Sequence, residues 1–503
     1  MTKLANRAAR FSDRVRMSGR APLVLLLAFL LAGLLAGCTT NPATGEPSFT
    51  PFMSKADEVR IGREEHPKIL KQFGGEVADP EIRRYAQSIV DLLVATSETP
   101  EEPFKATILN TDVVNAFALP GGYVYATRGL MTLAGNEAEF AGVLGHEIGH
   151  VTARHTAQRY SQSVVAQIGA VLAGAATGNR GVADLANLGA GLYLTSFSRD
   201  QEFEADMLGV RYMSRAGYDP GAMASFLDAL SMHSALEDRI AGKEGRPDGI
   251  DFFSTHPRTE DRVSEAISLA GERTVADPML ATDIYMKKID GMIYGSDPKQ
   301  GVIRNRSFIH PELRFTFDVP KGFRLVNSES QVLAVGPDKA RIIFDMAPEP
   351  VDGPMAYYLS EIWAPGASLT GLETITINGL EAATAAASVN TTDGEMAARL
   401  VAIRKDVQTI YRFLFLAPAG AMTSFSEEFR RTTHSFRLIS AKEAAAVRPL
   451  RLHVFRASAA DSVAALAAAM PFDDFKEERF RALNGLTPGQ GIRPGQWLKT
   501  VRQ

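Results

Sequence analysis

The chain has 503 residues, a formal charge of −4 and a single cysteine, Cys38. Six of the 54 Lys and Arg and one of the 58 Asp and Glu precede Cys38, so the 466 residues from Cys38 onward carry a formal charge of −9. This acidity argues against nucleic acid as a partner and against electrostatic binding to a membrane. The length suggests about three domains.

The N-terminal segment has the pattern of a targeting sequence, not of a folded element. Basic residues dominate positions 3–20, and the apolar stretch Ala21–Ala36 is short for a membrane-spanning helix. Leu35–Cys38 resembles the bacterial lipobox. Because Cys38 is the only cysteine, we expect lipidation there rather than a signal anchor or an ordinary secretory signal. Thr39, in place of Asp, favours sorting to the outer membrane by analogy with Gram-negative lipoproteins.

Helical and strand patterns follow a Pro- and Thr-rich tether. Helical spacing covers Ser54–Phe73 and Pro80–Ala95, and strand patterns cover Phe104–Asn110 and Tyr123–Thr127. These patterns predict several helices beside a small sheet. An edge strand can hold an extended peptide by backbone pairing, and Asn115–Leu119 is the candidate for that strand.

The next predicted helix carries the sequence His146-Glu147-Ile-Gly-His150. Asn136 and Glu139 have the spacing of a capping box and an apolar stripe follows, so the motif lies in mid-helix. His146 and His150 are one turn apart and can bind one Zn²⁺ from the same face. Glu147 can reach a water held there and accept its proton. The alternative is an amphipathic helix with two packed histidines.

Two histidines leave a catalytic zinc one protein ligand short. By helix arithmetic, His155 lies opposite His146, so it is expected to be structural or on the surface and not a ligand. Better candidates follow a second capping box, where Glu202 and Asp206 share one helix face and Glu204 points elsewhere. One of the two could bind zinc while the other hydrogen-bonds a ligand histidine. The alternative is a solvated acidic helix start.

Two further regions differ in character. Val164–Leu194 is rich in Ala, Gly, Val and Leu but too interrupted to span a membrane, so core helices are expected, with a mobile lid over the cleft as the alternative. From about residue 301 to 440, β-rich runs accompany the helical patterns Met355–Glu361 and Thr423–Phe436. This region is expected to be an α+β domain with a loose similarity to PsbP-like folds and a binding or scaffold role.

The two site motifs, His146-Glu147-x-x-His150 and Glu202-x-x-Ala-Asp206, resemble those of the HtpX/BepA/LoiP group of zinc metallopeptidases, which are gluzincins related to the CAAX prenyl endopeptidases. The resemblance covers about residues 50–270. It implies that His146, His150 and Glu202 are the zinc ligands and that Asp206 supports catalysis beside the metal.

The same resemblance extends to two other segments. It implies that the edge strand binds substrate through Asn115, Ala116 and Phe117. It also implies that His256, within Ser254-Thr-His-Pro257, approaches the zinc as a transient ligand or as a transition-state donor.

The chain from Leu450 onward resembles a LysM module. Asp461–Ala467, Phe480–Leu486 and Ile492–Leu498 match its first helix, its second helix with the following loop, and its last strand. Two alanines precede Asp461 where LysM modules have glycine. Peptidoglycan binding and protein binding are therefore both open for this module.

The sequence thus predicts an α+β protein with a mainly helical, zincin-like metallopeptidase domain that contains a small sheet. The expected segments are a lipoprotein signal peptide over 1–37, a tether over 38–53, the peptidase domain over 54–280, a β-rich α+β domain over 301–440 and a LysM-like module over 450–503. The expected function is hydrolysis of misfolded or misassembled envelope proteins by an endopeptidase with one Zn²⁺, lipid-anchored at the outer membrane and facing the periplasm. The alternative is a chaperone or assembly factor for outer-membrane proteins with vestigial or gated proteolysis.

Overall fold

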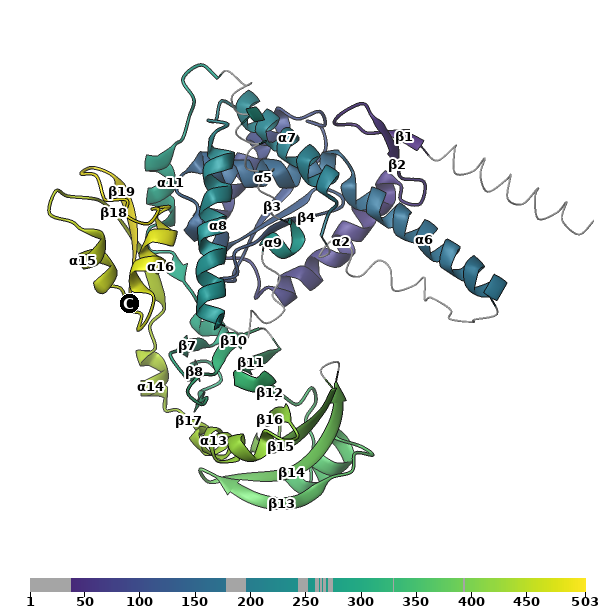
Figure 1. The fold of residues 1–503 in the computed structure, drawn as a ribbon, viewed down its shortest axis with the longest axis vertical. Helices are drawn as coiled ribbons and strands as arrows, with labels where there is room; N and C mark the ends of the chain where they lie inside the picture. The colour runs from purple at the N-terminus through teal and green to yellow at the C-terminus, as the bar shows by residue number, and fades with distance from the viewer. Residues whose placement is uncertain are drawn as a thin grey trace, which may run out of the picture.

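The computed structural model of the chain describes residues 38–177, 196–242, 252–257, 262, 265, 268–269, 275–328, 330–391 and 394–503 (Figure 1). The expected signal peptide and residues 178–194 of the alanine-rich segment lie outside these ranges. One large apolar core draws side chains from residues 43–292 and again from 452–501. Two further cores lie within residues 308–436. The expected mixture of helices and sheets, with a sheet-rich part in the second half of the chain, is confirmed.

The first part of the large core packs helices against a three-stranded sheet of order β3-β5-β4. Strand β4 lies at an edge of this sheet, where it pairs antiparallel with β5, while β3 pairs parallel with β5. The helices and strands of the chain up to residue 133 are β1 (Cys38–Thr40), β2 (Pro47–Phe49), α2 (Lys55–Gln72), α3 (Pro80–Ala95), β3 (Lys105–Leu109), β4 (Ala116–Leu119), β5 (Tyr123–Thr127) and α4 (Arg128–Leu133).

The helices that follow hold the site. They are α5 (Glu137–Thr152), α6 (His155–Thr177), α7 (Arg199–Arg215), α8 (Ala222–Ala241), α9 (Phe252–Thr255) and α11 (Thr282–Ile289). Helix α6 extends outward beyond the other helices (Figure 1). Among the described residues, no helix combines the length and the apolar character that crossing a bilayer requires.

Glycines bring α5 and α7 into close contact. A Cβ on Gly209 of α7 would lie 2.9 Å from the backbone nitrogen of His146, and a Cβ on Gly149 of α5 would lie 3.1 Å from the carbonyl oxygen of Ala205. The start of α5 differs from its prediction, since Asn136 caps the Glu139 N–H but the Glu139 side chain accepts from Gly135 N and not from Asn136 N. The capping box is therefore half formed.

The sheet-rich part contains two antiparallel sheets and helix α13. The smaller sheet has the order β17-β9-β8-β7, built from β7 (Val302–Arg304), β8 (Ser307–His310), β9 (Phe315–Asp318) and β17 (Arg437–Leu438). The larger sheet, of order β10-β11-β12-β16-β15-β14-β13, comprises β10 (Arg324–Asn327), β11 (Gln331–Val335), β12 (Arg341–Met346), β13 (Thr370–Ile377), β14 (Leu380–Thr391), β15 (Gly394–Asp406) and β16 (Thr409–Pro418). The helices of the sheet-rich part are α12 (Met355–Tyr357), which continues as a π-helical turn over Tyr358–Trp363, and α13 (Met422–Ser435).

The last part of the chain returns to the first part and packs against α4, α8 and α11. After α14 (Ala441–Ala446), it comprises β18 (Leu450–Arg456), α15 (Val463–Ala468), α16 (Lys476–Leu483) and β19 (Trp497–Arg502). Strand β18 pairs with β19 and with β6 (Ile293–Tyr294). The side chain of Lys499 in β19 is buried and donates to three backbone carbonyls at the end of α4. This segment is therefore part of the large core, and its LysM assignment stays a prediction.

Candidate metal centre

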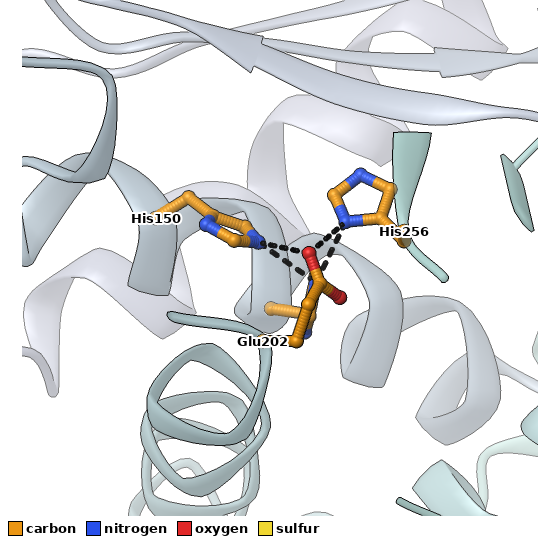
Figure 2. Close-up of side chains that lie close together, drawn as sticks. His150, Glu202 and His256 are labelled. Carbon is orange, nitrogen blue, oxygen red and sulfur yellow. Dashed lines mark hydrogen bonds and ion pairs between the residues drawn. The ribbon is translucent and has the colours of Figure 1, made fainter. Parts of the chain in front are cut away.

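Four buried side chains converge at the junction of α5, α7 and α9. His146 and His150 come from α5, Glu202 from α7, and His256 follows α9 directly. One nitrogen or oxygen atom from each lies within 4.8 Å of the others. Figure 2 shows His150, Glu202 and His256 pointing toward one another. The fold thus brings together the three residues predicted as ligands and the histidine predicted to approach them.

The separations between the donor atoms of these four side chains fit a single tetrahedral ion. His146 Nε2 lies 3.0 Å from His150 Nε2, 3.2 Å from His256 Nδ1 and 3.6 Å from Glu202 Oε2. Glu202 Oε1 lies 3.0 Å from His256 Nδ1 and 3.5 Å from His150 Nε2. Bonds of about 2.0–2.1 Å in a tetrahedron place ligand atoms roughly 3.3 Å apart. Both the spacing and the donor types suit a metal ion, and imidazole with carboxylate is a set that zinc takes.

Asp206 and Arg262 hold the cluster from behind. His146 Nδ1 lies 2.8 Å from Asp206 Oδ1, which leaves His146 Nε2 facing the cluster. Arg262 Nε and Nη2 donate to the two Asp206 oxygens at 2.7 and 2.8 Å, and Arg262 Nη1 lies 2.7 Å from Glu202 Oε2. Burial opposes ionisation of Asp206, but Arg262 and His146 outweigh it and lower its pKa to about 2. Asp206 is thus anionic and able to orient a ligand histidine, the position predicted for it.

The charges around Glu202 also favour its ionised form. Burial opposes ionisation, yet His256, His146 and Arg262 outweigh it and lower the pKa of the Glu202 carboxyl. Burial lowers the pKa of His150 well below its usual range, so its imidazole is neutral. A metal ligand set requires deprotonated carboxylate and neutral imidazole, and these two groups already have those states.

Glu147 lies beside the cluster without joining it. Its side chain is fully buried, and neither carboxylate oxygen makes a hydrogen bond within the part of the chain that the structure describes. His256 Nε2 lies 3.4 Å from Glu147 Oε1. Burial raises the pKa of Glu147, against the lowering effects of His256 and His146. A buried carboxylate with a raised pKa suits the exchange of protons with a reacting group.

His155 lies at the site and not on the surface. Helix α5 ends at Thr152 and α6 begins at His155, with Arg154 between them in the left-handed region at φ 58°. This break invalidates the helix arithmetic and places His155 Nδ1 2.8 Å from His150 Nδ1. The expected surface position is therefore wrong, and the structural alternative fits. Glu204, expected to point away from the other carboxylates, lies 3.2 Å from His155 Nε2.

The backbone groups of the edge strand β4 alternate between two directions. Some face β5, and the others face the open edge of the sheet. The Asn115 carbonyl accepts from Thr127 N on β5, and the two-residue alternation of an antiparallel pair directs the backbone of Phe117 to β5 as well. The backbone groups of Ala116 and Ala118 consequently face outward. Of the three residues predicted to bind substrate, Ala116 alone presents its backbone to the open edge.

A cavity of about 240 Å³ adjoins this edge. Its lining includes Ala118 of β4, Pro120 just after β4, and His150 and Val151 of α5. The cavity therefore lies between the outward-facing strand and helix α5, which carries His150, and it provides space beside the cluster for a side chain of a peptide laid along β4.

Sequence reasoning missed two residues that shape the site. Arg262 follows His256 by six positions, and no periodic pattern connects it with Asp206, 56 residues earlier. Phe197 stacks on the His150 ring at 3.8 Å between centroids, and the Arg159 guanidinium lies 3.7 Å from the centre of the Phe197 ring. The only local signal for Phe197 is its position just before the Ser198 cap of α7.

The part of the chain that holds the cluster is similar to known peptidases. Residues 80–270 match the model of "Peptidase family M48". The "Beta-barrel assembly-enhancing protease" of Escherichia coli (strain K12) is 30% identical over 279 residues, covering 52% of this chain and 55% of that protein. The protein of the same name from Yersinia pestis is 33% identical, with 44% and 46% covered. The "Mitochondrial metalloendopeptidase OMA1" of Schizosaccharomyces pombe is 27% identical, with 41% and 59% covered. The chain thus spans about half the length of these relatives.

Solved structures share only a limited likeness with this chain. LpqN of Mycobacterium tuberculosis aligns with a TM-score of 0.21 at 14% identity, covering 25% of this chain and 83% of LpqN. The cyanobacterial PsbP of Synechocystis sp. PCC 6803 aligns with a TM-score of 0.22 at 15% identity, covering 29% and 98%. The clustered residues all lie within residues 80–270, the segment that matches the model of "Peptidase family M48".

Proposed function

We propose that the chain is a zinc-dependent endopeptidase. The observation that carries the proposal is the buried Glu147 carboxylate, which has no hydrogen bond among the described residues and stands beside four converging metal donors. A protein that used the metal for structure alone would need the donors but not this carboxylate. The M48 match and the relatives named as proteases support the same activity.

The side chains of the site have distinct proposed roles. His146, His150 and Glu202 hold the ion, which supplies Lewis acidity to a scissile carbonyl and lowers the pKa of water. Glu147 accepts a proton from the attacking water and delivers it to the leaving amine. Asp206 orients His146, and Arg262 holds Asp206.

His256 has two alternative roles in this proposal. Its Nδ1 faces the cluster, which suits a fourth ligand in the resting site. Its Nε2 faces Glu147, and a donor in that region would stabilise an oxyanion. Glu202 and Glu147 raise the pKa of His256 against the opposing effect of burial. The raised pKa supports the donor role, whereas the position of Nδ1 supports the ligand role.

The proposed substrates are unfolded or misassembled proteins of the bacterial envelope. An extended peptide would pair with the outward backbone of Ala116 and Ala118, and a side chain near the scissile bond would enter the adjoining cavity. Such pairing uses the backbone hydrogen bonds of the substrate, which are available only where the substrate chain is unfolded. The Escherichia coli relative is named as a β-barrel assembly-enhancing protease, which supports an envelope substrate.

Lipidation of Cys38 would place this activity at the outer membrane, facing the periplasm. The proposal rests on Leu35–Cys38 and on the absence of any other cysteine in the sequence. A Cys38→Ser variant should lose the acyl chains, as intact-mass spectrometry of the purified protein would show. Unchanged acylation would contradict the assignment. Peptidoglycan binding by residues 450–503 is a separate proposal, which sedimentation with purified sacculi tests.

The decisive experiment compares wild type with Glu147→Gln on an unfolded protein substrate, with zinc content measured in both. We expect one zinc per chain in each protein and cleavage by the wild type alone, because the substitution removes the proton acceptor but none of the four donors. Glu139→Gln is the matched control, since residue 139 lies on the same helix, about two turns away from Glu147. If both proteins retain zinc and neither cleaves, the protease assignment fails and the chaperone alternative gains support.

A further inference from the structure

A continuous line of polar contacts leads from the metal cluster to the N-terminal hairpin. His150 Nδ1 lies 2.8 Å from His155 Nδ1, and His155 Nε2 lies 3.2 Å from Glu204 Oε2. The other Glu204 oxygen accepts from Asn41 Nδ2 at 2.6 Å. His150, His155 and Asn41 are each no more than 3% exposed. The contacts connect the end of α5 and the start of α6 with α7 and with the loop after β1, which are far from them in sequence.

A metal ion at the cluster would fix the direction of every hydrogen bond in this line. Coordination through His150 Nε2 puts the ring proton on Nδ1, which must then donate to His155 Nδ1. His155 consequently carries its own proton on Nε2 and donates it to the Glu204 carboxylate. Asn41 donates to the remaining Glu204 oxygen. With two neutral imidazoles and one carboxylate, every donor in this line has an acceptor. No proton donor therefore competes with the metal for the lone pair on His150 Nε2.

The orientation of the Asn41 amide is also fixed. Asn41 Oδ1 accepts from Ala43 N at 2.9 Å, so only the amino group is available to Glu204. The backbone of Asn41 is held by its N–H to the Glu46 carbonyl at 2.7 Å, and the Asn41 carbonyl accepts from Gly45 N at 2.9 Å. The turn between β1 and β2 therefore presents a rigid donor at the end of the line.

We propose that Asn41, Glu204 and His155 are positioning residues for His150, and that the hairpin Cys38–Phe49 thereby forms the outer part of the metal site. The inference rests on the proposed zinc site and adds to it a dependence of metal affinity on the N-terminal hairpin. Histidine ligands are commonly oriented by a carboxylate on their second nitrogen. Here His155 extends that contact, which allows a segment three residues from the proposed lipidation site to reach it.

A swap of donor and acceptor tests this connection directly. In Asn41→Asp two carboxylates face each other, and in Glu204→Gln one amide donor must face another donor. In the double variant, the Gln amide would donate to Asp and its oxygen would accept from His155, so that both contacts return. We expect each single variant to bind zinc about 10–100-fold more weakly than wild type and the double variant to recover most of this loss.

The measurement is the zinc dissociation constant of the full chain, obtained by competition with a chromophoric chelator. Thr39→Val is the matched control, because it removes a hydroxyl that donates to the Ser48 carbonyl within the same hairpin and lies 2.9 Å from the Thr50 hydroxyl just after it, and touches none of the positioning residues. Circular dichroism and thermal melting of the zinc-free proteins check the fold. His155→Phe removes the acceptor for His150 and should weaken zinc binding. Adding Asn41→Asp or Glu204→Gln to this variant should not restore the lost affinity.

The outcomes separate this inference from the proposed function. If the wild type binds zinc and each single variant binds it with an affinity within twofold of wild type, the positioning role is overturned. It is also overturned if the double variant binds zinc no more tightly than the sum of the two single losses predicts. An equal loss in Thr39→Val would show that the hairpin acts through stability alone and would also overturn it. A wild type that binds no zinc refutes the proposed function itself, whatever the variants do.

Discussion

Lys499 offers a quantitative test of how the last segment (residues 450–503) is joined to residues 43–292, the peptidase part. Its ammonium group donates to the carbonyls of Thr132, Leu133 and Ala134 at 2.9, 2.7 and 2.9 Å. These carbonyls end helix α4, where backbone acceptors lack helical partners and a cation is favoured. Lys499→Met keeps the length and apolar stem of the side chain but removes the titrating group.

The size of the effect follows from the change in proton affinity. Burial lowers the pKa of Lys499 from 10.5 to about 7. Between these two values the unfolded chain holds a proton that the folded chain has released, so the free energy of unfolding rises with pH. From pH 6 to pH 9, wild type should therefore gain roughly 2–3 kcal/mol relative to Lys499→Met, most of it above pH 7.

Denaturant unfolding at a series of pH values measures this difference. Trp497 lies in β19, and Trp363 is the only other tryptophan in the sequence, so a Trp363→Phe background makes fluorescence report on the last segment. Subtracting the curve for Lys499→Met cancels the other titrating groups. A difference that stays flat, or falls as pH rises, would refute the reasoning and would mean that the three carbonyls fully compensate the buried charge.

Three further predictions concern the peptidase part. Arg262→Met should weaken zinc binding about 10–100-fold, because Glu202 and Asp206 lose their shared cation; unchanged zinc retention during dialysis against a chelator would contradict it. Gly209→Ala should cost roughly 1–3 kcal/mol in chemical unfolding and also lower zinc affinity, since its Cβ meets the His146 backbone. Gly142→Ala, whose nearest contact is 3.4 Å, is its control, and an equal loss in the two would argue against the close helix contact. Arg154→Met should cost about 3–5 kcal/mol in unfolding free energy, because it leaves the buried Glu58 carboxylate without its 3.1 Å partner; a loss below 1 kcal/mol would show that the pair is dispensable.

The part of the site that sequence could predict lies within single helices. The 3.6-residue period places His146 above His150 and Glu202 above Asp206, wherever the helices themselves pack. The same arithmetic failed for His155, because the helix ends at Thr152 and the left-handed Arg154 redirects the chain. Local patterns predicted helix starts and β4 well for the same reason, namely that capping and strand alternation depend on near neighbours.

Contacts between distant segments were beyond such reasoning. Arg262 is 56 residues from Asp206 and Asn41 is 163 residues from Glu204, and neither pair lies in a repeating pattern. The contact of Lys499 with α4 spans 367 residues. Nothing in the local sequence around these polar side chains distinguishes them from solvated ones, because their burial is decided by which elements pack together.

The discontinuous core also has a consequence for the order of folding. Residues 43–292 leave the ribosome before 452–501, and the sheet-rich segment with its own cores is made between them. The peptidase part must therefore wait for a distant partner, and closing so long a loop is slow compared with forming helices or hairpins. Until β18 and α16 are made, α11, α8 and α4 lack part of their covering. Export of the chain before this core closes would keep the proposed proteolytic activity from developing on the cytoplasmic side during synthesis.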